Sequence, residues 1–211
     1  MANVAGAFGA LQWGTTSGPP NFAQYASATQ AFRIASGNAT AIGYGDLVQL
    51  VAGANPTGYI QRWVAGNGSA TVQVAGVFYG CAYQSTGQKR RVWSNFWPGS
   101  DATGDVEAFV DANPNSIFMI QSGDASVPID QTYIGMTADV VMGTVNTTTG
   151  SGLMSLLKPV GSTNTQNLPF KVLGPITAPP GVNGTDATTA FNNVLVTFNN
   201  QIFKSLLTIH S

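Results

Sequence analysis

Hydrophobic residues in this chain occur in short runs that turn-forming residues separate. Few windows keep the apolar repeat of an amphipathic helix over several turns. Thr, Asn, Gly and Ser are abundant throughout, and they favour turns and strands over helix interiors. The pattern therefore predicts an all-β domain. Strands are expected at residues 47–51, 60–64, 70–83, 92–97, 106–111, 116–121, 138–145 and 171–176, and the closing run 192–211 is either continuous or turned at Asn199-Asn200.

Glycines and short polar clusters mark the connections between these strands. Asn67-Gly68 is a strong signal for a type I′ hairpin turn. Gly76 and Gly80 interrupt a long predicted strand and indicate β-bulges there. Residues 127–135 and 153–157 are each expected to form a short helical turn, so helix is a minor component.

Residues 1–30 differ from the rest of the chain because they carry no charged side chain. Pro19-Pro20 enforces an extended path, and small residues separate the aromatic ones. We interpret this stretch as an extended N-terminal arm, followed by a single β-rich domain at residues 31–211. The aromatic residues of the arm are Phe8, Trp13, Phe22 and Tyr25.

The energetics of such an arm favour a partner. Burying four aromatic side chains at about 200 Å² each gains roughly 20 kcal/mol. Ordering about 25 residues costs about 25–50 kcal/mol of backbone entropy. The arm therefore needs backbone hydrogen bonds to a neighbour, or several arms acting together in an oligomer. The alternative is an edge strand packed on its own domain.

The charge content points to protein partners. Only 8% of residues are charged, and the formal net charge is -1. Small free-standing domains usually carry a net charge of roughly 2–8, which keeps molecules apart. We infer a surface committed to other protein surfaces, although some secreted β proteins also have few charges. Nucleic acid is not an expected partner, because clustered Lys and Arg are scarce. No membrane span or secretory signal is expected, because long apolar runs are absent.

The residue types that catalysis and metal binding need are scarce in this chain. The single histidine, His210, would be the base of any nucleophilic triad, and the single cysteine, Cys81, lies in an apolar strand typical of inert packing. One cysteine also excludes an intrachain disulfide and a Cys-rich zinc site. Glu107 and Asp111 would share a strand face about 13 Å apart, beyond the roughly 5–10 Å of glycosidase carboxylates. The sequence therefore predicts no enzyme, no cofactor and no metal site.

The predicted hairpin around residues 84–97 holds the densest cluster of basic and aromatic residues. Lys89, Arg90 and Arg91 either block unwanted strand addition at a sheet edge or dock on acidic side chains of a partner. Strand alternation places Trp93 and Trp97 on the same face, and both faces of this strand are expected to be covered. These tryptophans are either interface anchors or part of a hydrophobic core.

Several motifs resemble one family. The chain opens with MANVAGAFGALQW, which is similar to a start of the type MANV-x-x-x-FG-x. Residues 76–121 resemble the succession G-V-F-x-G-C-x-Y, S-x-x-W-P, A-x-V-x-D-x-P and F-x-I-Q. Further similarities are IGMTADVV and LPFKVLG. The family is the capsid cement, or decoration, proteins of tailed bacteriophages. Ala112 and the turn at residues 122–124 depart from its pattern in loops.

The resemblance implies a β-barrel or β-tulip-like domain that forms a homotrimer on the outer surface of an icosahedral head. It implies two partners, the major capsid protein and further copies of this chain, and a location on the capsid surface after assembly in the host cytoplasm. The expected capsid or trimer contacts are Phe8, Trp13, Phe22, Tyr25, Lys89, Arg90, Arg91, Trp93 and Trp97.

Two other functions fit the same residues. Another virion component, such as a head fibre base, a tail protein or an adsorption protein, would be present in far fewer copies than a cement protein. A carbohydrate-binding β module would use exposed Trp93 and Trp97 as a platform for a sugar.

Overall fold

The computed structural model describes residues 3–15, 29–51, 58–64, 72–159, 167–177 and 187–204. The predicted Asn67-Gly68 hairpin, two of the arm aromatics (Phe22 and Tyr25) and His210 lie outside the described residues.

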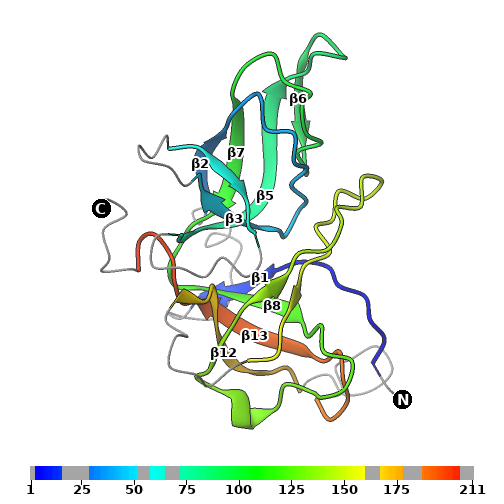
Figure 1. Ribbon diagram of the computed structural model, residues 1–211, viewed down its shortest axis with the longest axis vertical. Helices are drawn as coiled ribbons and strands as arrows, with labels where there is room; N and C mark the ends of the chain where they lie inside the picture. The colour runs from blue at the N-terminus through cyan, green and yellow to red at the C-terminus, as the bar shows by residue number, and fades with distance from the viewer. Residues whose placement is uncertain are drawn as a thin grey trace.

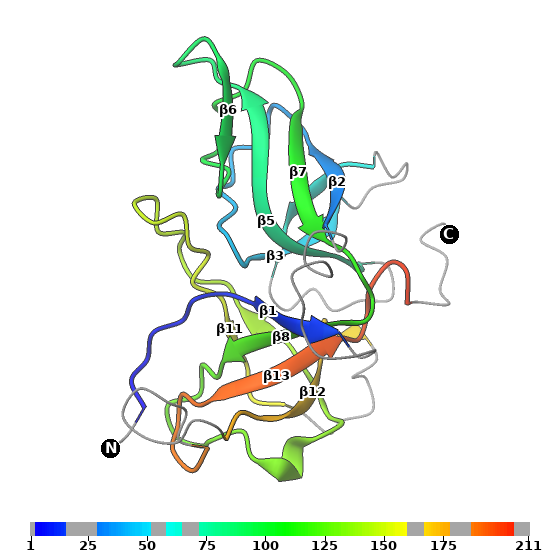
Figure 2. The same ribbon diagram turned by 180° about the vertical axis from the view of Figure 1, so that it is seen from behind.

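Two antiparallel sheets, one above the other in Figure 1, make up most of the fold, which confirms the all-β prediction. The upper sheet has the order β2-β7-β5-β3-β4, and β6 pairs with the far half of β5. Its strands are β2 (Thr29–Ile34), β3 (Leu47–Leu50), β4 (Ile60–Arg62), β5 (Val74–Gln84), β6 (Arg91–Ser94) and β7 (Val106–Asp111). Figure 2 shows the same stacking from behind.

The lower sheet has the order β1-β8-β13-β12-β9. Its strands are β1 (Leu11–Thr15), β8 (Ser116–Gln121), β9 (Thr137–Ala138), β12 (Phe170–Pro175) and β13 (Asn193–Phe198). A two-stranded ribbon, β10 (Val140–Val141) with β11 (Ser155–Leu156), and one 3-10 turn, η1 (Gln131–Tyr133), complete the described elements. No α-helix and no closed barrel occur among the residues that the structure describes.

Three of the predicted elements differ from the observed ones. The strand expected at residues 138–145 is divided, because Ala138 ends β9 and only Val140–Val141 form β10. Residues 153–157, expected as a helical turn, contain β11, because Met154 and Leu156 are buried and Leu156 pairs with Val140 of β10. The strand expected at 92–97 ends at Ser94, where the Ser94 hydroxyl accepts a hydrogen bond from Phe96 N. A contact distant in sequence therefore overrides the local pattern at β11, and a local side-chain hydrogen bond ends β6.

Strand β5 joins the two halves of the molecule. Its Val74 and Val77 pack in the hydrophobic core of the lower sheet, whereas Phe78 and Cys81 pack in that of the upper sheet. The pairing of β5 with β7 shifts register between Phe78 and Gly80, whose φ is 155°. A second shift lies beside Gly76, where a Cβ would collide with the backbone of β7. The predicted bulges are confirmed, and they bend the strand from one core into the other.

A buried ion pair fixes the place where the two sheets meet. The Asp46 carboxylate is fully buried and accepts hydrogen bonds from Gly43 N at 2.8 Å and from Arg62 Nε at 2.7 Å. Arg62 Nη2 bonds to the second Asp46 oxygen at 3.2 Å and also donates to the carbonyls of Gly143 and Gly152. Because those glycines belong to the loop between β10 and β11, this junction pair ties the upper sheet to the lower half. Burial raises the pKa of Asp46 to about 6, although Arg62 and Gly43 lower it.

The described part of the N-terminal stretch lies against its own domain. Strand β1 is an edge strand paired with β8, and Ala10 N donates to Gly45 O at 2.9 Å. This is the arrangement of the edge-strand alternative to a free arm. Residues 16–28 of the predicted arm lie outside the described part of the chain.

Candidate protein-interaction surface

The outer face of the upper sheet is defined by strands β6, β5, β7 and β2. Their registers place Trp93 opposite Ala82, Ala82 opposite Glu107, and Glu107 opposite Arg33. The neighbouring row contains Gly80 and Phe109. Because alternate residues point to opposite faces, these side chains all lie on the face away from the upper core.

Three side chains form a ridge on this outer face. Trp93 is 67% exposed and its ring lies parallel to that of Phe109, with centroids 5.5 Å apart and planes 1° apart. The guanidinium carbon of Arg91 lies 5.0 Å from the Trp93 ring centroid, a cation–π contact. Arg91 Nη2 also donates to Glu107 Oε2 at 2.9 Å, so the ridge is held on two sides.

The tip of the β5–β6 hairpin stands beside this ridge. Ser85 N donates to Arg90 O and Lys89 N donates to Ser85 O, both at 3.0 Å, and Lys89 has a φ of 57°. The Asp101 carboxylate accepts hydrogen bonds from Gly87 N at 3.1 Å and Ser85 Oγ at 2.8 Å, which hold its pKa below the usual range. The one acidic group at the tip is therefore satisfied by the hairpin itself.

The basic residues of the tip have no carboxylate partner in the described part of the chain. Ion pairs there join Arg33 to Asp105, Arg62 to Asp46, and Arg91 to Glu107. Arg90 Nε donates to the neutral Gln88 side chain at 2.9 Å, and Lys89 is exposed. Two exposed positive charges next to an exposed tryptophan favour contact with an acidic protein surface.

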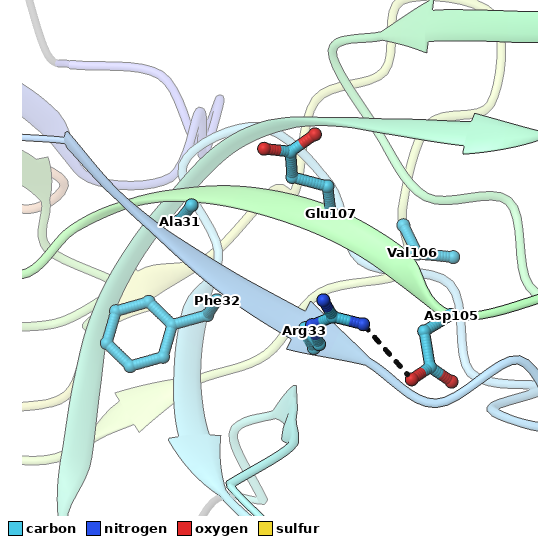
Figure 3. A pocket seen from close by; sticks show the side chains of 6 residues that line it. All are labelled: Ala31, Phe32, Arg33, Asp105, Val106 and Glu107. Atoms are coloured by element: carbon cyan, nitrogen blue, oxygen red, sulfur yellow. Dashed lines mark ion pairs between the residues drawn. The ribbon is translucent and has the colours of Figure 1, made fainter.

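A hollow of about 470 Å³ lies beside β2 and β7 (Figure 3). Arg33 Nη1 faces Asp105 Oδ2 across it at 3.6 Å, and Tyr59 donates its hydroxyl to the same oxygen at 2.7 Å. Glu107, on the same wall, is held by Arg91. Each charged group that lines the hollow therefore already has an ion-pair partner, Arg33 with Asp105 and Glu107 with Arg91. No group of three or more potential metal-binding side chains occurs among the residues described.

The predicted contact residue Trp97 is wrong, because it is a core residue. Its side chain is 0% exposed, packs edge-to-face on Tyr83 at 5.1 Å and donates Nε1–H to Asn38 O at 3.2 Å. The chain leaves β5 after Ser94, so strand alternation no longer holds at Trp97. A sugar platform made of Trp93 and Trp97 is therefore also wrong. In the single chain, one face of this strand leaves Trp93 exposed, so the expectation that both faces are covered stays a prediction about the assembly.

The remaining predicted contacts separate into two places. Lys89, Arg90, Arg91 and Trp93 come together on one hairpin of the upper sheet. Trp13 is 42% exposed and lies at the register shift of β1, on the lower sheet, while Phe8 is half-buried. A bulge of this kind re-aims a side chain, which accounts for the exposure of Trp13 at a sheet edge.

Two members of the ridge neighbourhood were not predicted as contacts, namely Phe109 and Glu107. The alternation VEAFVD in residues 106–111 carries the signal, because it puts both side chains on one strand face. Their pairing with Trp93 and Arg91 depends on the register of three strands, which no local pattern supplies.

Cys81 has the inert position that the sequence predicts. It is buried in the upper core, and its thiol donates to Phe96 O at 3.4 Å. Burial raises the pKa of this thiol to about 12, so the reactive thiolate is rare at neutral pH.

Comparisons with protein-family models, curated proteins and solved structures found no match to this chain. The resemblance to capsid decoration proteins therefore stays a prediction. In the part of the chain that is described, no helix is long and apolar enough to cross a membrane.

Proposed function

We propose that this chain is a structural virion protein, a capsid decoration or cement protein of a tailed bacteriophage. It binds the outer surface of the icosahedral head as a homotrimer and stabilises contacts between major capsid subunits. The observation that carries the proposal is the outer face of the upper sheet, where Trp93 is exposed beside Lys89 and Arg90, two cations with no carboxylate partner among the residues that the structure describes. The low charge and the motifs of residues 76–121 support it as well. The β-tulip-like arrangement and the location on the capsid surface belong to the same proposal.

The proposed protein acts by adding contacts that resist the separation of neighbouring shell subunits. Packaged DNA presses outward on a mature shell, and a protein that bridges neighbouring subunits adds contacts that must break before the subunits separate. A trimer presents three copies of the same surface, so moderate contacts combine into strong attachment through effective concentration. A near-neutral surface opposes such dense packing very little.

The test uses heads assembled without this protein. Purified protein is added to these heads, the particles are separated from free protein, and the bound amount is compared with the major capsid protein on a gel. Saturation at a fixed ratio of about one trimer per three-fold or quasi-three-fold position of the head, with a higher temperature of head disruption, is the expected result. Absence of binding, or saturation at only a few copies per particle, contradicts the proposal and favours another virion component.

The trimer is tested separately by sedimentation equilibrium of the full chain. A mass three times that of the monomer, 21.9 kDa, is expected. A monomer at concentrations that saturate the heads contradicts the trimeric part of the proposal.

A further inference from the structure

The register of the upper sheet determines which parts of Trp93 are free. Trp93 lies opposite Ala82 of β5. Phe109 lies opposite Gly80, two residues along β5 in one direction, and Arg91 lies opposite Gln84, two residues in the other. The ring stack with Phe109 and the cation–π contact with Arg91 therefore approach Trp93 from opposite sides.

With Phe109 on one side and Arg91 on the other, the outer edge is the part of the indole that a partner reaches most freely. Ala82, which lies opposite Trp93, is 3% exposed although it belongs to the outer face, whereas Trp93 itself is 67% exposed and stands out from the sheet. Stacking a flat sugar ring on an aromatic residue needs a wide free ring face, and here the Phe109 ring and the Arg91 guanidinium each take up part of the space beside the Trp93 ring. A projecting aromatic edge instead fits a slot between side chains of a protein, where tryptophan and arginine are the commonest anchors.

The charges around this edge indicate which charged groups a complementary partner carries next to its slot. The carboxylates of the outer face and of the tip are engaged within the chain, Glu107 by Arg91, Asp105 by Arg33 and Asp101 by the hairpin. The unmatched charge is therefore positive and sits at the hairpin tip. A complementary partner carries carboxylates at the same distance from its slot. Two cations are too few to give useful affinity for DNA at physiological salt.

We infer that Trp93 inserts edge-on into a narrow apolar slot of the major capsid protein, and that carboxylates on the rim of this slot pair with Lys89 and Arg90. This inference rests on the proposed function and names the chemistry of the partner surface. Trp93 supplies the buried contact, and the two cations orient the hairpin and accelerate association.

The experiment measures binding of full-length variants to heads assembled without this protein. Trp93→Ala removes the projecting edge, and Ile134→Ala removes an exposed apolar side chain (51% exposed) from the lower half as a matched control. We expect Trp93→Ala to weaken binding about 30-fold or more, the loss typical of an interface anchor. Ile134→Ala stays within twofold of the unchanged protein.

A second pair of variants tests the charges. In Lys89→Asn/Arg90→Gln both cations are lost, and asparagine accepts the left-handed backbone at position 89. Lys171→Gln removes an exposed cation from β12 as the control. The double variant is expected to bind about tenfold more slowly and to lose most of its salt dependence, whereas the control keeps both.

The possible results separate a failure of this inference from a failure of the proposed function. If the unchanged protein binds heads and Trp93→Ala binds within twofold of it, the inference is overturned and the proposed function stands. Binding of the unchanged protein to duplex DNA in a mobility-shift assay, or to a glycan array, with loss in Trp93→Ala, overturns the choice of partner. If the unchanged protein does not bind heads at all, both the proposed function and the inference fail.

Discussion

Two arginine–carboxylate pairs of the molecule have similar N–O distances but very different surroundings. Arg62 and Asp46 lie 2.7 Å apart at the junction of the sheets, and Arg91 and Glu107 lie 2.9 Å apart on the outer face. The junction pair has side-chain exposures of 14% and 0%, whereas the outer pair has 58% and 46%. Solvent screens the outer pair, so it contributes little to folding and is available to a partner. The junction pair is desolvated, so its loss leaves a buried charge.

The surroundings of each arginine show the same division. Arg62 donates to the Gly143 and Gly152 carbonyls as well as to Asp46, so its guanidinium is committed to the fold. Arg91 has one carboxylate and one aromatic neighbour and remains half-exposed. Arginine thus stabilises the junction in one place, and in the other it stays exposed beside Trp93, where we propose an interaction surface.

Breaking the junction pair has the largest expected effect. Arg62→Met keeps the volume but leaves the Asp46 carboxylate without its partner. We expect the free energy of unfolding in urea to fall by about 3–5 kcal/mol, the usual cost of an uncompensated buried charge. The double variant Arg62→Met/Asp46→Asn removes both charges and should recover a large part of the loss. A single-variant loss below about 1 kcal/mol would mean that the pair does not hold the junction.

Acid titration of the buried carboxylates is the next effect in size. Asp111 ends β7 at the crossing to the lower sheet and is fully buried; both its oxygens lie within 2.9 Å of the Ser116 hydroxyl. Burial raises its pKa from 3.8 to about 6, while Ser116 and Asn113 lower it. The folded state therefore holds the proton more tightly than the unfolded state, and this stabilisation is complete below pH 4 and lost as the pH rises through 6.

The matched variant for this titration is Asp111→Asn, which stays neutral and keeps an acceptor for the Asn113 N–H. Between pH 3 and 7 the unchanged protein is expected to lose up to about 3 kcal/mol more than this variant, as measured by urea unfolding. Asp46 shifts in the same direction in both proteins. Parallel pH profiles of the two proteins would show that Asp111 does not titrate in this range.

Crowding the junction should cost somewhat less. A Cβ on Gly152 would collide with the Asp46 carboxylate, so Gly152→Ala must push the junction pair apart. We expect a loss of about 1–3 kcal/mol in the free energy of unfolding, as for overpacked cores. Gly37→Ala is the control, since a Cβ there meets nothing within 4 Å and the position has no positive φ. Equal effects of the two substitutions would refute the close packing of the glycine against Asp46.

The outer face was more accessible to sequence reasoning than the junction. Residues 106–111 and 116–121 alternate regularly, and they are strands with those bounds. The basic and aromatic hairpin was also predicted, but strand alternation extended past Ser94 misplaced Trp97. The junction pair was not predicted, because Arg62 gathers acceptors from positions as distant in sequence as Gly152, and only the completed fold brings them together.

The smallest expected change in stability comes from the outer pair, and it separates stability from recognition. Glu107→Gln removes the carboxylate that holds Arg91 but keeps the shape of the side chain. The free energy of unfolding should change by at most about 1 kcal/mol, because both partners are exposed to solvent. Arg91 then becomes a third unpaired cation beside Trp93, so binding to heads should strengthen a few-fold at low salt and return toward the original value at high salt. A stability loss as large as that of Arg62→Met would mean that the outer pair stabilises the fold as the junction pair does. Binding weakened at all salt concentrations would mean that Glu107 does not restrain a cation that the partner recognises.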